Sequence, residues 1–339
     1  MGQSITIRVV GGSQIIKIKM CDKLTVIIPF LNEGEEIANT LRNLRETAND
    51  HLPILLIDDS STDHYDYEHV ANLYSAQYIK HKKRKGVAAS RDEGINMINT
   101  EYFVLLDGHM RFNQCGWDKT LLCHLLSDHK IVWCARTRAI TKKIDGQVVW
   151  DDGAKAFGAY MKLWKGSWNL GWNYIDPNPE SEVVDIPCIL GACYASNKKY
   201  WQYLGGLNGL LEYGLDEQMI SAKVWLNGGS CKLIKKLEVG HIYRTSFPYI
   251  VNSGICIFNR LLLTELLLPE LYKSKFRNQI IAEFGMGFYL RAIRKINVFD
   301  QLIINQKNYF SNKFVVDFES LVEINKFYGM QTILKSKNI

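Results

Sequence analysis

Residues 102–109 read YFVLLDGH, and this stretch decides the fold. The apolar run Tyr102–Leu106 has the length and composition of a buried β-strand in a parallel sheet. It ends in Asp107 and His109, two metal-competent side chains one residue apart. Because side chains alternate along an extended chain, both point to the same side of the backbone. Such a strand end favours an open α/β sheet, in which ligands bind at the carboxyl ends of the strands.

The segments before this strand repeat an alternation of strand and helix. Apolar runs at 24–29, 54–57 and 78–79 predict strands, and apolar spacing predicts helices over 35–45, around 70–73 and over 86–98. This order predicts a doubly wound α/β sheet. Alternating residues on both sides of Gly11-Gly12-Ser13 predict a β-hairpin. We therefore expect an N-terminal hairpin (1–21), an α/β domain (22–254) and a C-terminal helical extension (255–339).

The amino-acid composition limits the classes of ligand that we expect this protein to bind. The net charge of +6 favours anionic ligands such as nucleotides, but it is too small to predict binding to a nucleic acid. The basic run at 81–85 is more typical of a solvated loop. The cysteines are scattered, with no CxxC pair, which predicts reduced thiols and a cytoplasmic protein. We find no signal-peptide pattern and no apolar run of the ~18 residues that a membrane span requires.

A third candidate metal ligand, His241, lies in the segment VGHIYR at 239–244. One carboxylate oxygen and two imidazole nitrogens suit a divalent cation such as Mn2+ or Mg2+, with positions left open for phosphate oxygens. Such a cation would neutralise the charge that develops on a leaving diphosphate. The alternative is that Asp107 only caps a helix or accepts hydrogen bonds from backbone amides.

Other polar side chains also follow strands or begin helices. Asp58 and Asp59 follow the strand at 54–57, and Arg91 lies on the helix at 86–98. Asp58 is a candidate for binding the base or ribose of a nucleotide, and the planar guanidinium of Arg91 suits a diphosphate. Asp216 and Glu217 begin a predicted helix and offer a general base. Helix capping explains both acid pairs equally well.

Taken in order, these segments resemble the GT-A glycosyltransferases of family 2. They are most similar to the catalytic domain of the polypeptide N-acetylgalactosaminyltransferases and its bacterial relatives. The resemblance covers residues 22 to 275 and implies a GT-A fold with a mixed sheet. The segments that carry it are LTVIIPFLNE (24–33), LIDDSSTD (56–63), KGVAASR (85–91), LLDGH (105–109), GACYASNKKYW (191–201), YGLDEQ (213–218) and GHIYR (240–244).

The resemblance implies a UDP-sugar donor and a metal held by Asp107, His109 and His241. It also implies that residues 245–254 form a loop that closes over the nucleotide. The residues that it places around the donor are Pro29, Glu33, Asp58, Asp59, Arg91, Asp107, Gly108, Gly191 and Ala192.

The acidic pair departs from the pattern of the retaining enzymes in this group, which have Glu-Asn where this chain has Asp216-Glu217. In inverting relatives the second acid is the base. The resemblance therefore favours inversion, with Glu217 as base and Asp216 positioning hydroxyl groups. It leaves the acceptor open among a carbohydrate, a lipid-linked sugar and a protein, and it suggests a role in bacterial surface glycan synthesis.

Two other functions stay open. A non-catalytic sugar-nucleotide-binding protein could share the fold, although such a binder need not keep both metal ligands and acids. A nucleotidyltransferase usually has a Gly-rich loop after the first strand, and residues 30–33 are not one. The tryptophan-rich segment at 150–174 is either core or a sugar-stacking face. Phe284, Phe288, Leu290 and Ile293, with Arg291, Arg294 and Lys295, predict either peripheral membrane contact or an ordinary packing layer.

Overall fold

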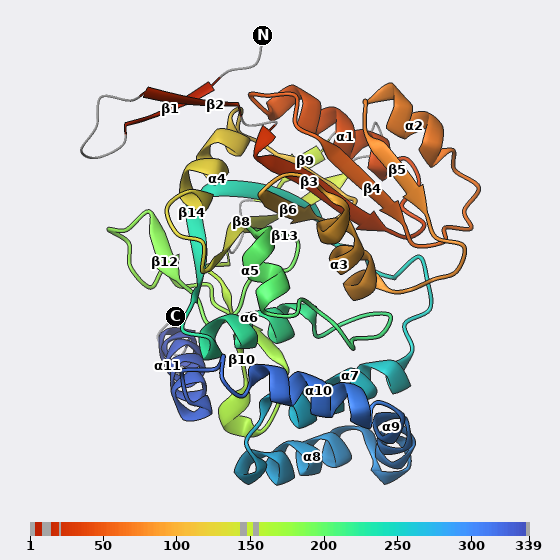
Figure 1. Cartoon of the computed structure of the whole chain (residues 1–339), viewed down its shortest axis with the longest axis vertical. Coiled ribbons are helices and arrows are strands. Elements are labelled where there is room, and N and C mark those ends of the chain that lie inside the picture. Colours follow the sequence, from red (N-terminus) through yellow and green to blue (C-terminus); the bar gives the residue numbers. More distant parts are fainter. Residues whose placement is uncertain (1–3, 9–14, 20–21, 143–147, 152–155, 337–339) are drawn as a thin grey trace.

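The computed structural model describes residues 4–8, 15–19, 22–142, 148–151 and 156–336 (Figure 1). Within these residues the centre is a ten-stranded mixed sheet with the order β12-β14-β8-β13-β6-β3-β4-β5, to which β7 and β9 add at β14 and β8. The predicted doubly wound mixed sheet is confirmed. Its strands are β3 (Leu24–Phe30), β4 (Ile54–Asp58), β5 (Gln77–Lys80), β6 (Tyr102–Leu106), β7 (Met110–Phe112), β8 (Ile131–Lys142), β9 (Val148–Trp150), β12 (Val183–Asp185), β13 (Cys193–Asn197) and β14 (Ser230–Ile242).

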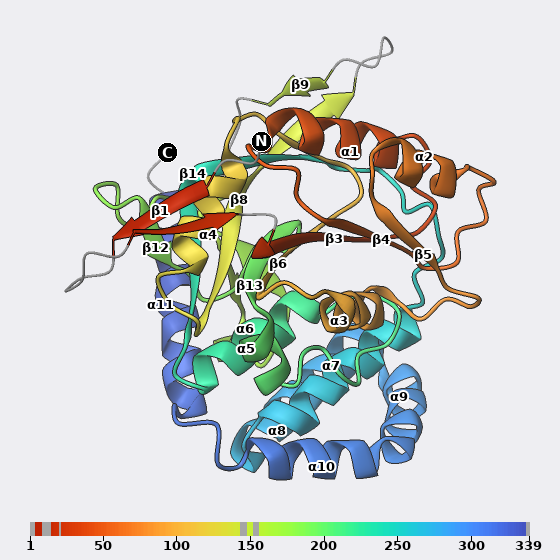
Figure 2. The same ribbon diagram turned by 45° about the horizontal axis from the view of Figure 1, so that its top comes forward.

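The strands β6, β3, β4 and β5 run parallel, and helices cover both of their faces (Figure 2). Alternate residues of β3 point to opposite sides. Ile27 packs in one buried cluster with Ala88 and Ile95 of α3 (Val87–Met97). Val26 and Ile28 pack in the other, with residues of α1 (Glu36–Thr47) and α2 (Tyr67–Leu73). Burial on both faces explains why these strands read as continuous apolar runs.

The other half of the sheet brings two distant segments together at one edge of the cavity described below. β13 runs antiparallel between β6 and β8, and β14 runs parallel to β8. The short strand β7 pairs antiparallel with the end of β14, with Met110 opposite His241. The register of this pair therefore places His109 beside His241. The helices of this half are α4 (Trp117–Leu125), α5 (Lys198–Tyr203) and α6 (Asp216–Leu226).

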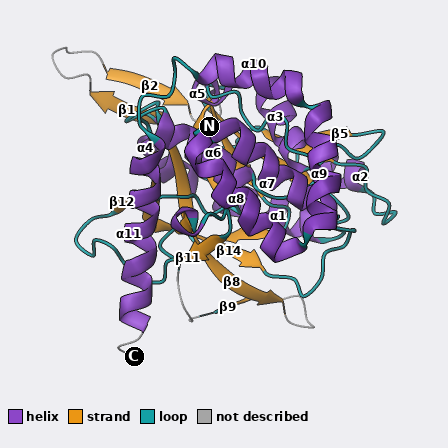
Figure 3. Cartoon of the chain, turned by 90° about the horizontal axis from the view of Figure 1, so that it is seen from below, coloured by secondary structure: helices purple, strands orange, loops and turns teal. Residues whose placement is uncertain are grey.

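The C-terminal helices pack beneath α3 and α6 (Figures 1 and 3). They are α7 (Ser253–Leu267), α8 (Glu270–Phe284), α9 (Met286–Val298), α10 (Asp300–Phe310) and α11 (Phe318–Ser336). Phe258 and Leu261 of α7 belong to the same buried cluster as Ile27 of β3. Residue 254 therefore marks a change in secondary structure and not a boundary between two cores. No helix in the described part of the chain is long and apolar enough to cross a membrane.

Two smaller features of the sequence have a mixed outcome. The hairpin is present as β1 (Ser4–Arg8) paired antiparallel with β2 (Ile15–Lys19). In the tryptophan-rich segment Trp168 belongs to the core, where it donates a hydrogen bond to Thr264, while Trp150 and Trp164 are half-buried. Trp172 and Tyr174, at and after β11 (Leu170–Trp172), are the exposed members of the segment among the residues described. β11 pairs with β10 (Ala159–Met161).

Candidate active site

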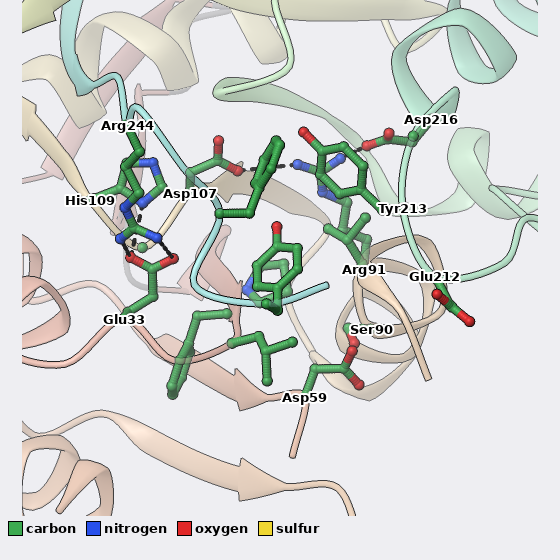
Figure 4. Close-up of a pocket in the computed structure, with 18 of the residues that line it drawn as sticks. Glu33, Asp59, Ser90, Arg91, Asp107, His109, Glu212, Tyr213, Asp216 and Arg244 are labelled. Atoms are coloured by element: carbon green, nitrogen blue, oxygen red, sulfur yellow. Dashed lines mark hydrogen bonds and ion pairs between the residues drawn. The ribbon is translucent and has the colours of Figure 1, made fainter. Parts of the chain in front are cut away.

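A cavity of about 370 Å³ lies at the carboxyl ends of β3 and β6 (Figure 4). Its walls come from segments that are far apart in the sequence. Of the predicted site residues, the cavity wall contains Pro29, Glu33, Asp59, Arg91, Asp107, Gly108, His109, Asp216, Glu217 and His241.

Three of these side chains form a cluster that could hold a metal ion. Asp107, His109 and His241 each offer one ligand atom, and these atoms lie within 4.8 Å of one another. The two Nε2 atoms are 3.1 Å apart, and His241 Nε2 is 3.6 Å from Asp107 Oδ2. Without a cation, the Nε2–H of one imidazole must donate a hydrogen bond to the Nε2 atom of the other. A divalent cation would accept both nitrogen lone pairs and the carboxylate oxygen at once, so the donor set fits such an ion.

Glu33 holds this cluster in position. His109 Nδ1 lies 3.0 Å from Glu33 Oε2, and this contact leaves the Nε2 atom of His109 free to act as a ligand. Arg244, at the end of the segment that carries His241, pairs with both oxygens of the same carboxylate. Glu33 therefore supports both His109 and the segment that carries His241, and its predicted contact with the donor stays a prediction.

Arg91 joins the metal cluster to the acidic pair. Its guanidinium is buried, lies 3.2 Å from Asp107 Oδ1 and forms an ion pair with Asp216 (Figure 4). Burial lowers the pKa of Arg91, but the neighbouring Tyr194, Asp107 and Glu217 outweigh it and raise the pKa above its ordinary value. Helix α6 begins after Leu215 with no side-chain cap, and Asp216 and Glu217 lie in its first turn, where the helix dipole favours acids.

Glu217 follows Asp216 in helix α6 and lies against the backbone of Gly191. A methyl group at Gly191 would meet Glu217 Oε1 at 1.7 Å, so any side chain at this position would displace the Glu217 carboxylate. Burial raises the pKa of the Glu217 carboxyl, while Arg91 opposes that rise. A carboxyl group with a raised pKa at a cavity wall is suited to accept a proton.

This geometry can be set beside known proteins. Residues 25–169 match the family model described as Glycosyl transferase family 2. This segment is similar to glycosyltransferase family 2 domains. Human polypeptide N-acetylgalactosaminyltransferase 14 is 26% identical over 242 residues, which are 68% of this chain and 42% of that protein. Human polypeptide N-acetylgalactosaminyltransferase 10 is 29% identical over 257 residues, 70% of this chain and 40% of that protein.

A solved structure extends the likeness over more of the chain. The crystal structure of GalNAc-T7 with UDP, GalNAc and Mn2+ superposes with a TM-score of 0.72 and 20% identity. The match covers 90% of this chain and 57% of that one. It shows the GT-A fold. The chain thus spans less than half the length of the two human relatives.

The two acids at the end of β4 have hydrogen-bond partners within the chain. Asp58 is 0% exposed and lies outside the cavity wall. Its carboxylate accepts hydrogen bonds from the backbone N–H of Ser61 and from the Tyr78 hydroxyl, at 2.6 and 2.8 Å. Asp59 lines the cavity, but it accepts the backbone N–H groups of Lys85 and Gly86, both at 2.8 Å. Both carboxylates therefore order the surrounding loops, and Asp58 offers no open oxygen to a nucleotide.

Gly191 and Ala192 support the site through their backbone. The Gly191 carbonyl lies 3.4 Å from Arg91 Nη2, and the Ala192 carbonyl accepts the N–H of Asp107 at 3.1 Å. Neither residue belongs to the cavity wall itself. Their predicted contact with the donor sugar stays a prediction.

Sequence reasoning missed an aromatic wall. The rings of Tyr213 and Phe247 lie 5.2 Å apart, and those of Phe247 and Tyr249 lie 5.6 Å apart. Phe247 and Tyr249 belong to the loop between β14 and α7, which the Pro248 carbonyl anchors to Asn32 Nδ2 at 3.1 Å. The loop was predicted, but its only signal for an aromatic wall was the density of rings in YRTSFPY at 243–249.

Proposed function

We propose that this chain is a metal-dependent glycosyltransferase that moves a sugar from a UDP-sugar to a hydroxyl acceptor. One observation carries the proposal: a cation-type cluster, a buried arginine and a protonatable acid line a single cavity at the strand ends of a domain similar to those of family 2. The crystal structure of GalNAc-T7 contains UDP and Mn2+, which supports the choice of donor and metal.

Asp107, His109 and His241 would hold Mn2+ or Mg2+. Such an ion, when bound, neutralises the negative charge on a departing diphosphate. Other residues of the chain support the three metal ligands. Glu33 fixes the tautomer of His109, and Arg91, 3.2 Å from Asp107 Oδ1, keeps that carboxyl ionised. Burial raises the pKa of Asp107, yet His241, Arg91 and His109 lower it further, below its ordinary value.

Glu217 is the proposed base that takes the proton from the acceptor hydroxyl. This assignment favours inversion at the anomeric carbon, because an external hydroxyl then attacks the donor directly. Asp216 holds Arg91 through one oxygen, and its other oxygen can accept a hydrogen bond from a sugar hydroxyl. The aromatic wall of Tyr213, Phe247 and Tyr249 would exclude water from the donor and so limit hydrolysis.

The cellular role is part of the same proposal. The free, exposed thiols of Cys115 and Cys123 support a reducing, cytoplasmic location. We propose a bacterial-type enzyme of surface glycan synthesis that contacts the inner membrane face through its C-terminal helices. Its acceptor would then be a carbohydrate or lipid-linked sugar rather than a protein, and no nucleic acid is involved.

The test is nucleotide release from a panel of UDP-, GDP- and CMP-sugars with and without Mn2+. Mn2+-dependent release of UDP from one donor supports the proposal, and NMR of the product then gives the anomeric configuration. A retained configuration would reject Glu217 as base while leaving the transfer itself intact. No release from any donor, together with no nucleotide binding by calorimetry, would favour the non-catalytic binder.

A further inference from the structure

One edge of the molecule combines exposed apolar side chains with cations. It consists of residues 81–86 between β5 and α3, residues 243–252 between β14 and α7, and helix α9. All three segments lie on the right in both Figure 1 and Figure 2. We call this surface the loop–α9 edge.

Direct contacts join the two loops, and α7 connects the second loop to α9. Arg84 Nη1 donates to the Ile250 carbonyl at 3.1 Å, and its guanidinium lies 4.9 Å from the centre of the Tyr249 ring. The second loop leads straight into α7, on which α9 packs. There Phe258 of α7 contacts the ring of Phe299 at 4.9 Å, just after α9 ends. The edge therefore consists of two contacting loops at the cavity wall and, on the same side of the molecule, the outer surface of α9.

The apolar part of this edge is large and faces outward. Ile250 is 84% exposed, although Phe247 and Tyr249 beside it line the cavity. On α9, Leu290 is 48% and Val298 is 81% exposed, while Ala292 and Ile296 are buried on the opposite side. Single exposed apolar residues are common, but a loop tip and a helix face that expose several together mark an interaction surface.

The charges of this edge have one sign. Lys82, Lys83, Arg291 and Arg294 are exposed, and none of them forms an ion pair with another described residue. By contrast, the nearby Lys85 is bound to Glu93 at 2.6 Å. Asp300, at the start of α10, is the exposed acid that follows α9. Four cations without ion-pair partners beside apolar side chains match a surface that carries negative charge above an apolar layer.

We propose that the loop–α9 edge docks on an anionic phospholipid bilayer. Ile250 and Leu290 enter the headgroup region, and the four cations lie against lipid phosphates. A second copy of the chain fits less well, because a symmetric contact would set cations against cations. The same loop forms the cavity wall and the edge, so docking places the cavity opening near the bilayer. Docking of this edge therefore deepens the proposed function. Only the choice of a lipid-linked acceptor rests on that function.

Vesicle binding by the full chain, with no nucleotide present, tests this. We expect co-sedimentation with vesicles of phosphatidylcholine and phosphatidylglycerol, release by added salt, and little binding to pure phosphatidylcholine. Each surface cation contributes about fivefold to partitioning, so Lys82→Gln with Lys83→Gln should lower binding about 25-fold. Ile250→Asp and Leu290→Asp should each lower it about tenfold or more.

Matched controls change the same residue types elsewhere. Lys119→Gln with Lys130→Gln removes two exposed lysines beside α4, and Leu73→Asp alters an exposed leucine on α2. These variants should bind like the wild type. The proposal is overturned if anionic vesicles are not bound, if the controls lose as much binding as the edge variants, or if Leu290→Asp instead abolishes a dimer. Vesicle binding without UDP release would retain the docking surface and reject the proposed function.

Discussion

Glu33→Gln should weaken metal binding without disturbing the fold. The Glu33 side chain is 6% exposed. It acts through His109 Nδ1, at 3.0 Å, and through Arg244, which engages both of its oxygens. Glutamine keeps the size of the side chain but replaces one acceptor oxygen with an N–H donor, which would face the guanidinium of Arg244. The charge that orients His109 is lost at the same time.

The size of the effect follows from this support role. Loss of a partner behind a metal-bound histidine usually costs 10- to 100-fold in affinity, or about 1.4 to 2.7 kcal/mol. Because Glu33 supports both His109 and the segment that carries His241, we expect the upper part of this range. The ligands themselves remain, so weak binding should persist at high Mn2+ concentration.

The assay is a titration with Mn2+, followed by calorimetry or by the electron paramagnetic resonance of free Mn2+. Neither readout requires a donor or an acceptor. Glu68→Gln, an exposed glutamate on α2, makes the same chemical change away from the cavity and should bind like the wild type. If Glu33→Gln folds normally and its dissociation constant equals that of the wild type, the proposed support of His109 is refuted.

Further predictions concern the ligands, the base and a buried lysine. His109→Ala and His241→Ala should each abolish Mn2+-dependent UDP release with circular dichroism unchanged, and full activity in both would reject the metal site. Glu217→Gln should slow transfer about 10²- to 10⁴-fold with UDP affinity retained. Because burial raises the pKa of Glu217, wild-type activity should rise with pH through that pKa, and a flat profile would argue against a base. Burial lowers the pKa of Lys223 to about 7, below its ordinary value of 10.5. Between these two pH values the unfolded chain binds a proton that the folded chain does not bind. The free energy of unfolding of the wild type in urea should therefore rise with pH in this window by up to about 1.4 kcal/mol per pH unit relative to Lys223→Met, and parallel profiles would contradict this.

The order of strands and helices was predictable because it depends on local patterns. Strands buried on both faces need continuous apolar runs, and the helices that cover them need apolar residues at helical spacing. The predicted helix at 216–226 agrees with α6, and the predicted strand at 102–106 agrees with β6. Asp107 and His109 could be placed on one side of the chain from strand geometry alone.

The partners of these residues could not be predicted from local patterns. The contact between His109 and His241 depends on the register of β7 against β14, which only tertiary pairing sets. The bond of Arg91 to Asp216 joins a helix after β5 to a helix after β13. The sequence shows that Glu33 follows the strand β3, which suggested a contact with the donor. It does not show that Glu33 pairs with Arg244. Long-range hydrogen bonds leave no periodic trace in a sequence.

The contrast between Asp58 and Asp107 shows what decides the role of an acid at a strand end. Both follow buried parallel strands, so sequence reasoning treated both as ligand-binding. After Asp58 the chain turns back, and the N–H of Ser61 donates a hydrogen bond to the Asp58 carboxylate at 2.6 Å. This carboxylate is therefore occupied by contacts within its own loop. After Asp107 comes Gly108, where a methyl group would meet Glu33 Cγ at 2.9 Å. The missing side chain lets Glu33 approach His109, and the chain continues into β7 instead of folding back. The residues after the acid, rather than the acid itself, therefore determine whether its oxygens remain open to a ligand.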